Sequence, residues 1–320
     1  MKANTYEMKN YLSIDIGGTN LKYALLDNAG NIIEKGKTKS PHEKEKFLTT
    51  VDQVVKNYAE KDIKGLAFCA PGKIEYTKIH FGGALPFLDG IDFSEIYKDL
   101  NIPVAVINDG KASVLAENWL GNLKDLQNCA AITLGSGVGG GIIVNGRLLN
   151  GAHFQAGELS FMVLKMAKEM GFDDIAGTMG SAVRMVSQVI KAIGNEDETD
   201  GLAAFEAINS GNEQALKILR SYCWDVVGII VNIQSVVDLT TIAIGGGISA
   251  QPILVEEINR AYDQFLDQMP MYKMTLTRPK IVEAKFKNDA NLFGALYNLL
   301  LHGDRKIFCV RMNISLILFP

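Results

Sequence analysis

The sequence predicts a mixed α/β protein of two domains, and three observations support this interpretation. The chain has 320 residues, roughly twice the ~150 residues of an average domain. A unit of apolar strand, glycine-rich turn and returning strand occurs twice, first near residue 12 and again near residue 130. Further strands and helical patterns follow each unit, which is typical of α/β folds. We therefore expect two related domains, each beginning with this unit.

The first half begins with three predicted strands joined by turns that contain glycine and asparagine. They are Leu12–Ile16, Leu21–Leu26 and Ile32–Lys39. Apolar residues then recur at helical spacing from Phe47 to Tyr58. The other elements that we predict here are a buried strand, a helix, a strand and a helix: Ile63–Ala70, Phe93–Leu100, Pro103–Ile107 and Lys111–Trp119.

The second half repeats the opening unit with strand Ala130–Leu134, a glycine turn from Gly135 to Gly141 and a returning strand Ile142–Val144. Asn145-Gly146 is a strong hairpin signal. The later predicted elements are three helices, a strand and two more helices: Ser181–Ile193, Ala203–Ile208, Glu213–Val237, Thr241–Ile244, one from Ile253, and Ala290–Leu301. The apolar segment Lys306–Pro320 has no clear period, and both an extra strand and a docked segment stay open for it.

Composition excludes several classes of protein. The 32 Lys and Arg against 36 Asp and Glu give a net charge of −4, whereas binding to nucleic acid or to a membrane surface normally requires a basic patch. The longest stretch without charge, Leu126–Gly146, contains six glycines and is unlike a membrane span. The start of the chain has no signal-peptide pattern. The four cysteines lie far apart without a CxxC pair. We therefore expect a cytoplasmic protein with no nucleic-acid or membrane partner.

Three glycine-rich turns are the candidate binding features: Asp15–Asn20, Leu134–Gly141 and Ile244–Ile248. Glycine lets the backbone approach a ligand and present N–H groups to an anion, although any one of these turns could be a hairpin without a ligand. The segment from Gly135 to Gly140 spells GxGxxG, but a dinucleotide fingerprint must open a helix, and a strand is predicted here. The repeated turns favour phosphate binding and disfavour a dehydrogenase.

Four motifs in order resemble the ROK family of sugar kinases, which belongs to the actin-like ATPase superfamily. They are Asp15-Ile16-Gly17-Gly18-Thr19-Asn20, Ile107-Asn108-Asp109, Leu134-Gly135-Ser136-Gly137-Val138-Gly139-Gly140-Gly141 and Gly157-Glu158. The resemblance extends from Tyr11 to about Leu301. It implies two RNase-H-like α/β domains with an interdomain cleft, ATP and Mg²⁺ as cofactors, and a homodimer.

The resemblance also implies roles for individual residues. Asp109 would be the catalytic base that accepts the proton of a sugar hydroxyl, although a helix N-cap is its structural alternative. Asp15 would help to hold Mg²⁺ through ATP. The other residues implied to contact ATP are Gly17, Gly18, Thr19, Asn20, Lys22, Gly135, Ser136, Gly137, Gly139, Gly245, Gly246 and Gly247. Those implied to contact the sugar are Asn108, Glu158, Gly72, Gly82, Phe161 and His153.

The match departs from the family at its zinc site. The family continues Gly-Glu-x-Gly-His and completes a zinc site with cysteines, whereas this chain has Phe161 at the histidine position and no cysteine between Val163 and Arg184. Zinc needs about four N or S ligands, so we expect no zinc, and His153 reads as structural or supporting. A phenyl ring in place of a polar group predicts relaxed recognition at C1 and C2 of the sugar, with room for a glycoside or an N-acetyl group.

The sequence thus predicts ATP-dependent phosphorylation of a sugar primary hydroxyl, at O6 of a hexose, glycoside or N-acylhexosamine. The alternative is a sugar-binding regulator of the same family without catalysis, although only ten residues precede Tyr11 and a DNA-binding domain needs more. We expect an N-terminal domain over residues 1–118, a C-terminal domain over 119–288, a closing helix over 289–302 that packs back on the first domain, and a tail over 303–320 of unknown role.

Overall fold

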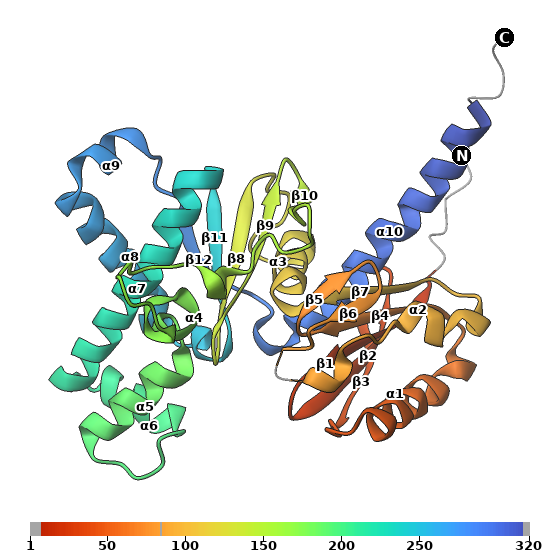
Figure 1. Cartoon of the computed structure of the whole chain (residues 1–320), viewed down its shortest axis with the longest axis horizontal. Coiled ribbons are helices and arrows are strands. Elements are labelled where there is room, and N and C mark those ends of the chain that lie inside the picture. The colour runs from red at the N-terminus through yellow and green to blue at the C-terminus, as the bar shows by residue number, and fades with distance from the viewer. Residues whose placement is uncertain (1–7, 84, 316–320) are drawn as a thin grey trace. The chain divides into compact units, whose positions relative to one another are not determined.

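The chain forms two compact units in a computed structural model that describes residues 8–83 and 85–315, with side chains described as far as His302 (Figure 1). The first unit comprises the chain up to Ala116, the short segment Ala152–Phe154 and the chain from Asp289 onward. The second comprises Glu117–Gly151 and Gln155–Asn288. Each unit contains one five-stranded mixed sheet.

The sheet of the first unit has the strand order β3-β2-β1-β4-β7. Its strands are β1 (Asn10–Ile16), β2 (Asn20–Asp27), β3 (Ile32–Lys39), β4 (Ile63–Ala70) and β7 (Val104–Asn108). The first three form an antiparallel meander, whereas β1, β4 and β7 run parallel. Because parallel strands end at one edge of a sheet, the turns that follow β1, β4 and β7 lie along the same edge.

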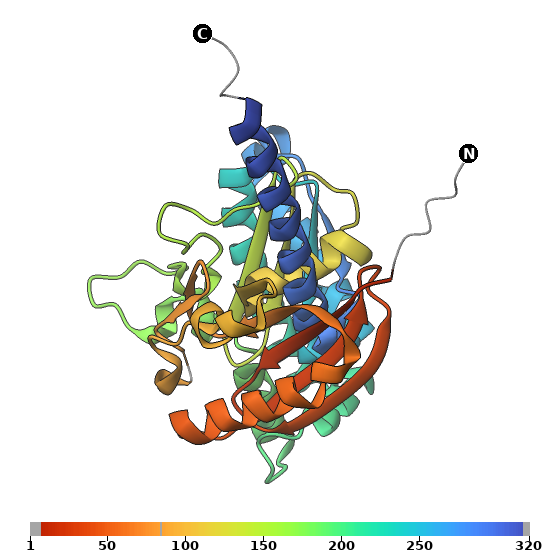
Figure 2. The ribbon, with the colours of Figure 1, turned by 90° about the vertical axis from the view of Figure 1, so that its right-hand side faces the viewer.

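Helices cover both faces of this sheet (Figures 1 and 2). Leu12, Ile14 and Ile16 of β1 are buried in one core with residues of α1 (Lys44–Asn57). The intervening Ser13 points to the other face, where its hydroxyl donates to the carbonyl oxygen of Leu292 at 2.7 Å. This alternation follows from the two-residue period of a strand. Three more helices belong to this part of the chain: α2 (Phe93–Ile96), α3 (Asp109–Leu120), which continues into the second unit, and α10 (Ala290–Ser315).

A small two-stranded sheet follows β4. It consists of β5 (Lys73–Glu75) and β6 (Lys78–His80), joined by the two-residue turn Tyr76-Thr77. Short 3₁₀ helices complete the connections in this unit: Ala59–Lys61, Pro86–Leu88, Lys98–Leu100 and Lys287–Asp289 at the junction with α10.

The sheet of the second unit repeats the topology of the first, with the order β10-β9-β8-β11-β12. Its strands are β8 (Cys129–Leu134), β9 (Val138–Val144), β10 (Arg147–Leu148), β11 (Thr241–Gly245) and β12 (Lys280–Glu283). Strands β8, β9 and β10 form an antiparallel meander, and β8, β11 and β12 run parallel. The internal duplication predicted from the sequence is confirmed by this shared strand order.

The helices of the second unit pack around the long helix α7 (Glu213–Val237). The others are α4 (Ala176–Met179), α5 (Ala182–Ile193), α6 (Gly201–Asn209), α8 (Pro252–Gln268) and α9 (Pro270–Thr275), with 3₁₀ turns at Leu159–Phe161, Phe172–Asp174 and Gly247–Ala250. Val226 and Ile230 of α7 share a buried core with Ile132 of β8. The apolar stripe of α7 therefore packs on the sheet, as expected for an amphipathic helix.

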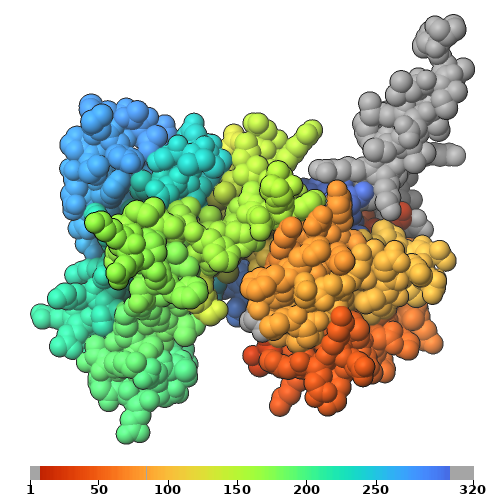
Figure 3. Space-filling model, viewed as in Figure 1, coloured from red at the N-terminus to blue at the C-terminus, as the bar shows by residue number. Residues whose placement is uncertain are grey.

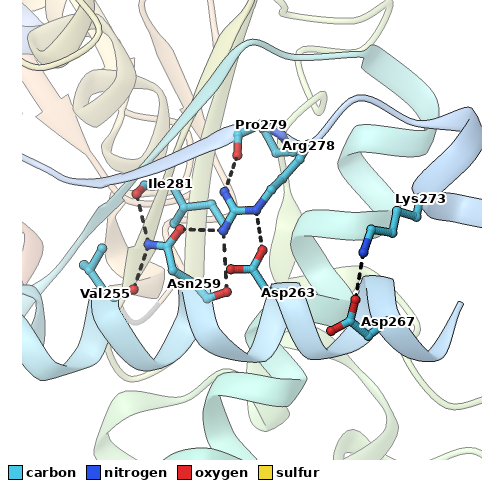
Figure 4. Close-up of polar contacts among 8 residues, drawn as sticks. All are labelled: Val255, Asn259, Asp263, Asp267, Lys273, Arg278, Pro279 and Ile281. Carbon is cyan, nitrogen blue, oxygen red and sulfur yellow. Dashed lines mark hydrogen bonds and ion pairs between the residues drawn. The ribbon is translucent and has the colours of Figure 1, made fainter. Parts of the chain in front are cut away.

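Arg278 holds α8 against the strand that follows it (Figure 4). Its guanidinium donates to Asp263 Oδ1 at 2.7 Å and to Asn259 Oδ1 at 2.9 Å. The Asn259 amide in turn donates to the carbonyl oxygens of Val255 and Ile281. A charged fork with several acceptors fixes geometry better than a single ion pair does, so these bonds set the register of α8 against β12.

Several predicted element bounds were wrong. The glycine turn after β8 is limited to Gly135–Gly137, because Gly139, Gly140 and Gly141 pair with β8 inside β9. The helix predicted over Phe93–Leu100 ends at Ile96 and continues as a 3₁₀ turn. Helix α10 extends past Leu301 to Ser315, and residues 316–320 of the predicted tail lie outside the described chain. The β5–β6 hairpin, α9 and β12 were not predicted. No helix among the described residues is long and apolar enough to cross a membrane.

Helix α10 crosses α3 closely, and Gly294 makes this possible. A Cβ atom at Gly294 would lie 1.9 Å from the carbonyl oxygen of Ala112. We expect Gly294→Ala to lower the free energy of unfolding by at least ~1–3 kcal/mol, the usual cost of overpacking, although alanine is the better helix former. Gly201→Ala, at a helical position with open space around it, is the control. Denaturant titration measures both, and equal stability of the two variants would contradict the close crossing.

Candidate functional site

The carboxyl edge of the first sheet gathers most of the predicted polar residues of the first unit. Asp15 of β1 pairs with Cys69 of β4, which pairs with Ile107 of β7. The glycine turn after β1, the Pro71-Gly72 turn after β4 and Asn108-Asp109 therefore leave the sheet side by side. In α/β sheets this edge is where ligands bind.

Asn108 connects two of these segments through its side-chain amide. Its Nδ2 donates to the carbonyl oxygen of Gly72 at 3.0 Å, and its Oδ1 accepts from the N–H groups of Gly110 at 2.9 Å and Lys111 at 3.3 Å. Asn108 therefore occupies the N-cap of α3, and the helix begins at Asp109. The sequence indicates Asp109 as an alternative N-cap, but Asn108 occupies that position. The same side chain also bonds the carboxylate of Asp109, which opposes the rise in the pKa of that group.

Asp109 presents an exposed carboxylate at the first turn of α3. Its Oδ1 accepts from the N–H of Gly110 at 2.8 Å. The surrounding protein reduces the hydration of the carboxylate, and this raises its pKa above the ordinary value, with a further contribution from the negative charge of Asp15. An accessible carboxylate with a raised pKa is a stronger base than a free aspartate.

Asp15 is buried, with 5% of its surface exposed. Its Oδ1 accepts from Nδ2 of Asn291 at 2.9 Å, and its Oδ2 lies 3.5 Å from Nζ of Lys22. Desolvation raises the pKa of Asp15, although the bond from Asn291 and the charge of Lys22 oppose this effect. Asn291, at the start of α10, was not predicted from the sequence, because no motif marks a residue so distant from β1.

The turn after β1 presents open backbone. It is closed by a hydrogen bond from the N–H of Gly17 to the carbonyl oxygen of Asn20 at 3.1 Å. Gly18 is exposed, and a Cβ atom at this position would meet no protein atom within 4 Å. The ring of His42 lies 2.9 Å from the carbonyl oxygen of Gly18, a contact that the sequence did not predict. Space beside an exposed peptide group is what an anion needs to approach.

The two glycine turns of the second unit also meet at a carboxyl edge. Strands β8 and β11 are parallel neighbours, and Gly245 pairs with Thr133. Gly246 has a φ of +102°, and a Cβ atom there would lie 2.0 Å from the carbonyl oxygen of Leu134. The backbones are in contact because this position is glycine. By contrast, Gly135 and Gly247 face open space within 4 Å, so this edge also presents accessible peptide groups.

Two buried hydroxyls of the described chain lack a hydrogen-bond partner, and both lie beside glycine turns. Thr133 Oγ1 is at the end of β8, and Ser40 Oγ belongs to the residue whose N–H donates to the carbonyl oxygen of Thr19. Buried polar atoms are normally satisfied. Their position fits a polar ligand or an ordered water at each turn.

The remaining predicted sugar-contacting residues divide between the units. Gly72, Gly82, Asn108 and His153 belong to the first unit, and His153 is exposed. Glu158 and Phe161 belong to the second unit, where Glu158 is the N-cap and Phe161 the last residue of a 3₁₀ turn, with Phe161 68% exposed. This turn is fixed to β9, since Ser160 Oγ donates to the carbonyl oxygen of Val138 at 2.9 Å. The predicted ATP contacts Asn20 and Lys22 lie on β2, Ser136 and Gly137 lie in the turn after β8, and Gly139 lies in β9.

The segment for which the sequence predicts no zinc site is closed by main-chain bonds. The N–H of Ala176 donates to the carbonyl oxygen of Met162 at 2.8 Å, and that of Leu164 to the carbonyl oxygen of Asp174 at 2.9 Å. Within the residues that the structure describes, no three His, Cys, Asp or Glu side chains are placed to hold a metal ion.

Comparison with known proteins gives this arrangement a family. A sequence model of the ROK family matches residues 11–301. The chain belongs to the ROK family. It is 30% identical over 306 residues to a β-glucoside kinase of Listeria innocua serovar 6a, covering 92% of this chain and 98% of that protein.

Solved structures of ROK proteins share the fold. A ROK family protein from Streptococcus pneumoniae TIGR4, in complex with sucrose, superposes with a TM-score of 0.81 at 29% identity and covers 92% of this chain and 99% of that one. A ROK family glucokinase from Streptomyces griseus, in complex with glucose and AMPPNP, has a TM-score of 0.75 at 21% identity, with 90% and 98% coverage. The predicted actin-like α/β fold of this ROK protein is thereby confirmed.

The influence of Asp15 on Asp109 can be tested directly. We expect Asp15→Asn to lower the pKa of Asp109, because it removes a nearby negative charge while asparagine still accepts the bond from Asn291. Carboxyl ¹³C chemical shifts followed through a pH titration measure this pKa. Asp99→Asn, at an exposed site of the same unit, should leave it unchanged. An unaltered pKa in Asp15→Asn would show that the two carboxylates are not coupled.

Proposed function

We propose that this ROK protein is an ATP-dependent sugar kinase that phosphorylates a primary hydroxyl, at O6 of a hexose or a hexose derivative. The observation that carries the proposal is the exposed carboxylate of Asp109, held by the Asn108 amide at the same sheet edge as the open turn at Gly18. Family membership and the named activity of the Listeria relative agree with it.

Asp109 would act as the general base. A sugar hydroxyl is a weak nucleophile at neutral pH, so a carboxylate within hydrogen-bond reach orients it and accepts its proton as the O–P bond forms. The raised pKa of Asp109 makes it a better proton acceptor than a free aspartate. The amide of Asn108 would donate to a neighbouring hydroxyl, and Glu158 would accept from ring hydroxyls.

The glycine turns would hold ATP. Phosphoryl transfer depends on positioning and on neutralising the charge of the phosphates. Peptide groups at Gly18, Gly135 and Gly247 have the open space that this requires, and Lys22 supplies a positive charge near the first turn. A ROK family glucokinase from Streptomyces griseus was crystallised with glucose and AMPPNP, which agrees with this assignment.

Mg²⁺ fits the carboxylates at the first sheet edge, because it prefers hard oxygen ligands and keeps several of its waters. Asp15 is already bonded to Asn291 and paired with Lys22, so we assign it to the waters of a nucleotide-bound ion. The ion would neutralise phosphate charge. A cytoplasmic location, a homodimer and the absence of zinc remain predictions of the sequence.

Asp109→Asn tests the catalytic role. We expect kcat to fall by ~10²-fold or more, the scale of general-base loss, while calorimetric Kd values for sugar and ATP stay within a few-fold. Asparagine keeps the acceptor for the N–H of Gly110, so the fold is retained. ADP release should be measured with glucose, cellobiose and N-acetylmannosamine. Sugar binding by the wild-type protein without turnover on any of them would favour the regulatory alternative.

Gly135→Ala tests the phosphate turn without disturbing the protein. A methyl group at Gly135 meets no protein atom within 4 Å, so thermal unfolding should be unchanged. We expect it to obstruct the approach of phosphate and to raise the KM for ATP by ~10-fold, equivalent to about 1.4 kcal/mol of binding. Gly201→Ala is again the matched control. A KM equal to that of the wild type would remove this turn from the nucleotide site.

A further inference from the structure

Three aromatic residues around the Asp109 segment have backbone conformations that aromatic residues rarely adopt. Tyr76, Phe81 and Phe154 have φ values of +58°, +51° and +59°. For bulky side chains a positive φ is a genuine outlier, and such outliers cluster at ligand-binding sites. Tyr76 occupies the first central position of a two-residue hairpin turn, where glycine or asparagine is usual. All three residues belong to the first unit.

Two of these aromatic side chains are exposed to solvent. Tyr76 is 79% and Phe81 is 74% exposed. Tyr76 packs edge to face on Phe154, with ring centroids 5.2 Å apart and planes at 63°. We call the Tyr76–Phe154 pair the aromatic platform. Because Tyr76 is exposed, the platform presents ring surface to solvent. The hairpin that carries Tyr76 is orange in Figures 1 and 3.

The aromatic platform is anchored to the helix that carries Asp109. The side chain of Lys111 is 5% exposed, and its Nζ donates to the carbonyl oxygen of Phe154 at 2.8 Å. Lys111 lies two residues after Asp109. A buried ammonium group makes strong hydrogen bonds, so the position of Phe154, and with it the contact to Tyr76, is fixed relative to the first turn of α3.

Phe81 is joined to the same segment by a second route. Its carbonyl oxygen approaches Gly72 so closely that a Cβ atom there would lie 1.9 Å away. The carbonyl oxygen of Gly72 accepts from Asn108. The N–H of Phe81 donates to Asp89 Oδ1 at 2.9 Å. Residues on both sides of Asp109 are thus connected to exposed aromatic residues.

Polar groups on the hairpin accompany the aromatic platform. Glu75 lies 3.5 Å from Lys73 and from His80, and all three side chains are partly exposed. A mixture of ring faces with donors and acceptors matches a pyranose, which has an apolar C–H face and hydroxyl groups at its edge. A protein partner would need a larger continuous apolar patch.

We propose that the aromatic platform is a subsite for the second ring of a β-glucoside, so that the acceptor of this kinase is a disaccharide such as cellobiose. This rests on the proposed function, because the first ring must present its primary hydroxyl to Asp109. The second ring stacks on Tyr76, and hydroxyl groups of that ring bond the polar side chains of the hairpin.

The experiment compares kcat/KM for cellobiose and for glucose in four proteins: wild type, Tyr76→Asn, Tyr76→Phe and Leu202→Ala. Asparagine tolerates positive φ, so Tyr76→Asn removes the ring without straining the turn. We expect it to lower kcat/KM for cellobiose by ~10-fold, the loss of one aromatic contact, and to change the value for glucose less than twofold. Tyr76→Phe keeps the ring and should resemble the wild type. Leu202, 82% exposed on α6, is the control for loss of exposed apolar surface.

The outcomes separate the subsite from the proposed function. Three results would overturn the subsite. Tyr76→Asn could change kcat/KM equally for both sugars, it could change neither value, or Tyr76→Phe could be as impaired as Tyr76→Asn. A wild type that phosphorylates glucose but not cellobiose would overturn it too, and would leave the kinase assignment intact. If the wild type phosphorylates no sugar, the proposed function fails. Calorimetry then tests the subsite alone. If the subsite exists, Tyr76→Asn must bind cellobiose more weakly than the wild type does.

Discussion

The side-chain amide of Asn108 makes three hydrogen bonds on which the arrangement of the candidate site depends. They join the turn after β4 to the first turn of α3, and Asp109 lies directly between these attachment points. A carboxylate in a helix's first turn is favoured by the helix dipole, but that preference does not fix its direction. The amide of Asn108 fixes the backbone beside Asp109 and so limits where its carboxylate can lie. Rigid support of this kind is what a general base requires if it is to meet a hydroxyl at hydrogen-bond distance.

The two units share a topology and differ in the chemistry at equivalent places. Two residues before the glycine turn, the first unit has the carboxylate of Asp15 and the second has the hydroxyl of Thr133. The third parallel strand ends in Asn108 in the first unit, whereas β12 ends in Glu283. A carboxylate repels phosphate unless a cation intervenes, while a hydroxyl can donate to it. At the turn that follows the first strand, the duplicated fold thus has an acid in the first unit and a neutral hydroxyl donor in the second.

The sequence predicted those parts of the molecule that depend on local pattern. The positions of Asp109 and of the turns at Gly18 and Gly135 after strands were predicted correctly, because motif and strand end coincide along the chain. Asn291 and His42 were missed, since each reaches its partner through tertiary packing that no spacing reveals. The length of the second glycine turn was wrong because strand pairing outweighed the conformational freedom of Gly139. The positive φ of Tyr76 could not be predicted, as nothing in a Tyr-Thr pair indicates it.

The first unit is assembled from three separate stretches of chain, of which the last begins at Asp289. Helix α10, which lies against β1, β4 and β7, is therefore synthesised after every residue of the second unit. On the ribosome one face of the N-terminal sheet therefore stays uncovered while residues 117–288 are added. The second unit, interrupted by only three residues, has no such delay. The order of folding can thus be the reverse of the order of synthesis. The second unit is made later, yet it can complete its core first.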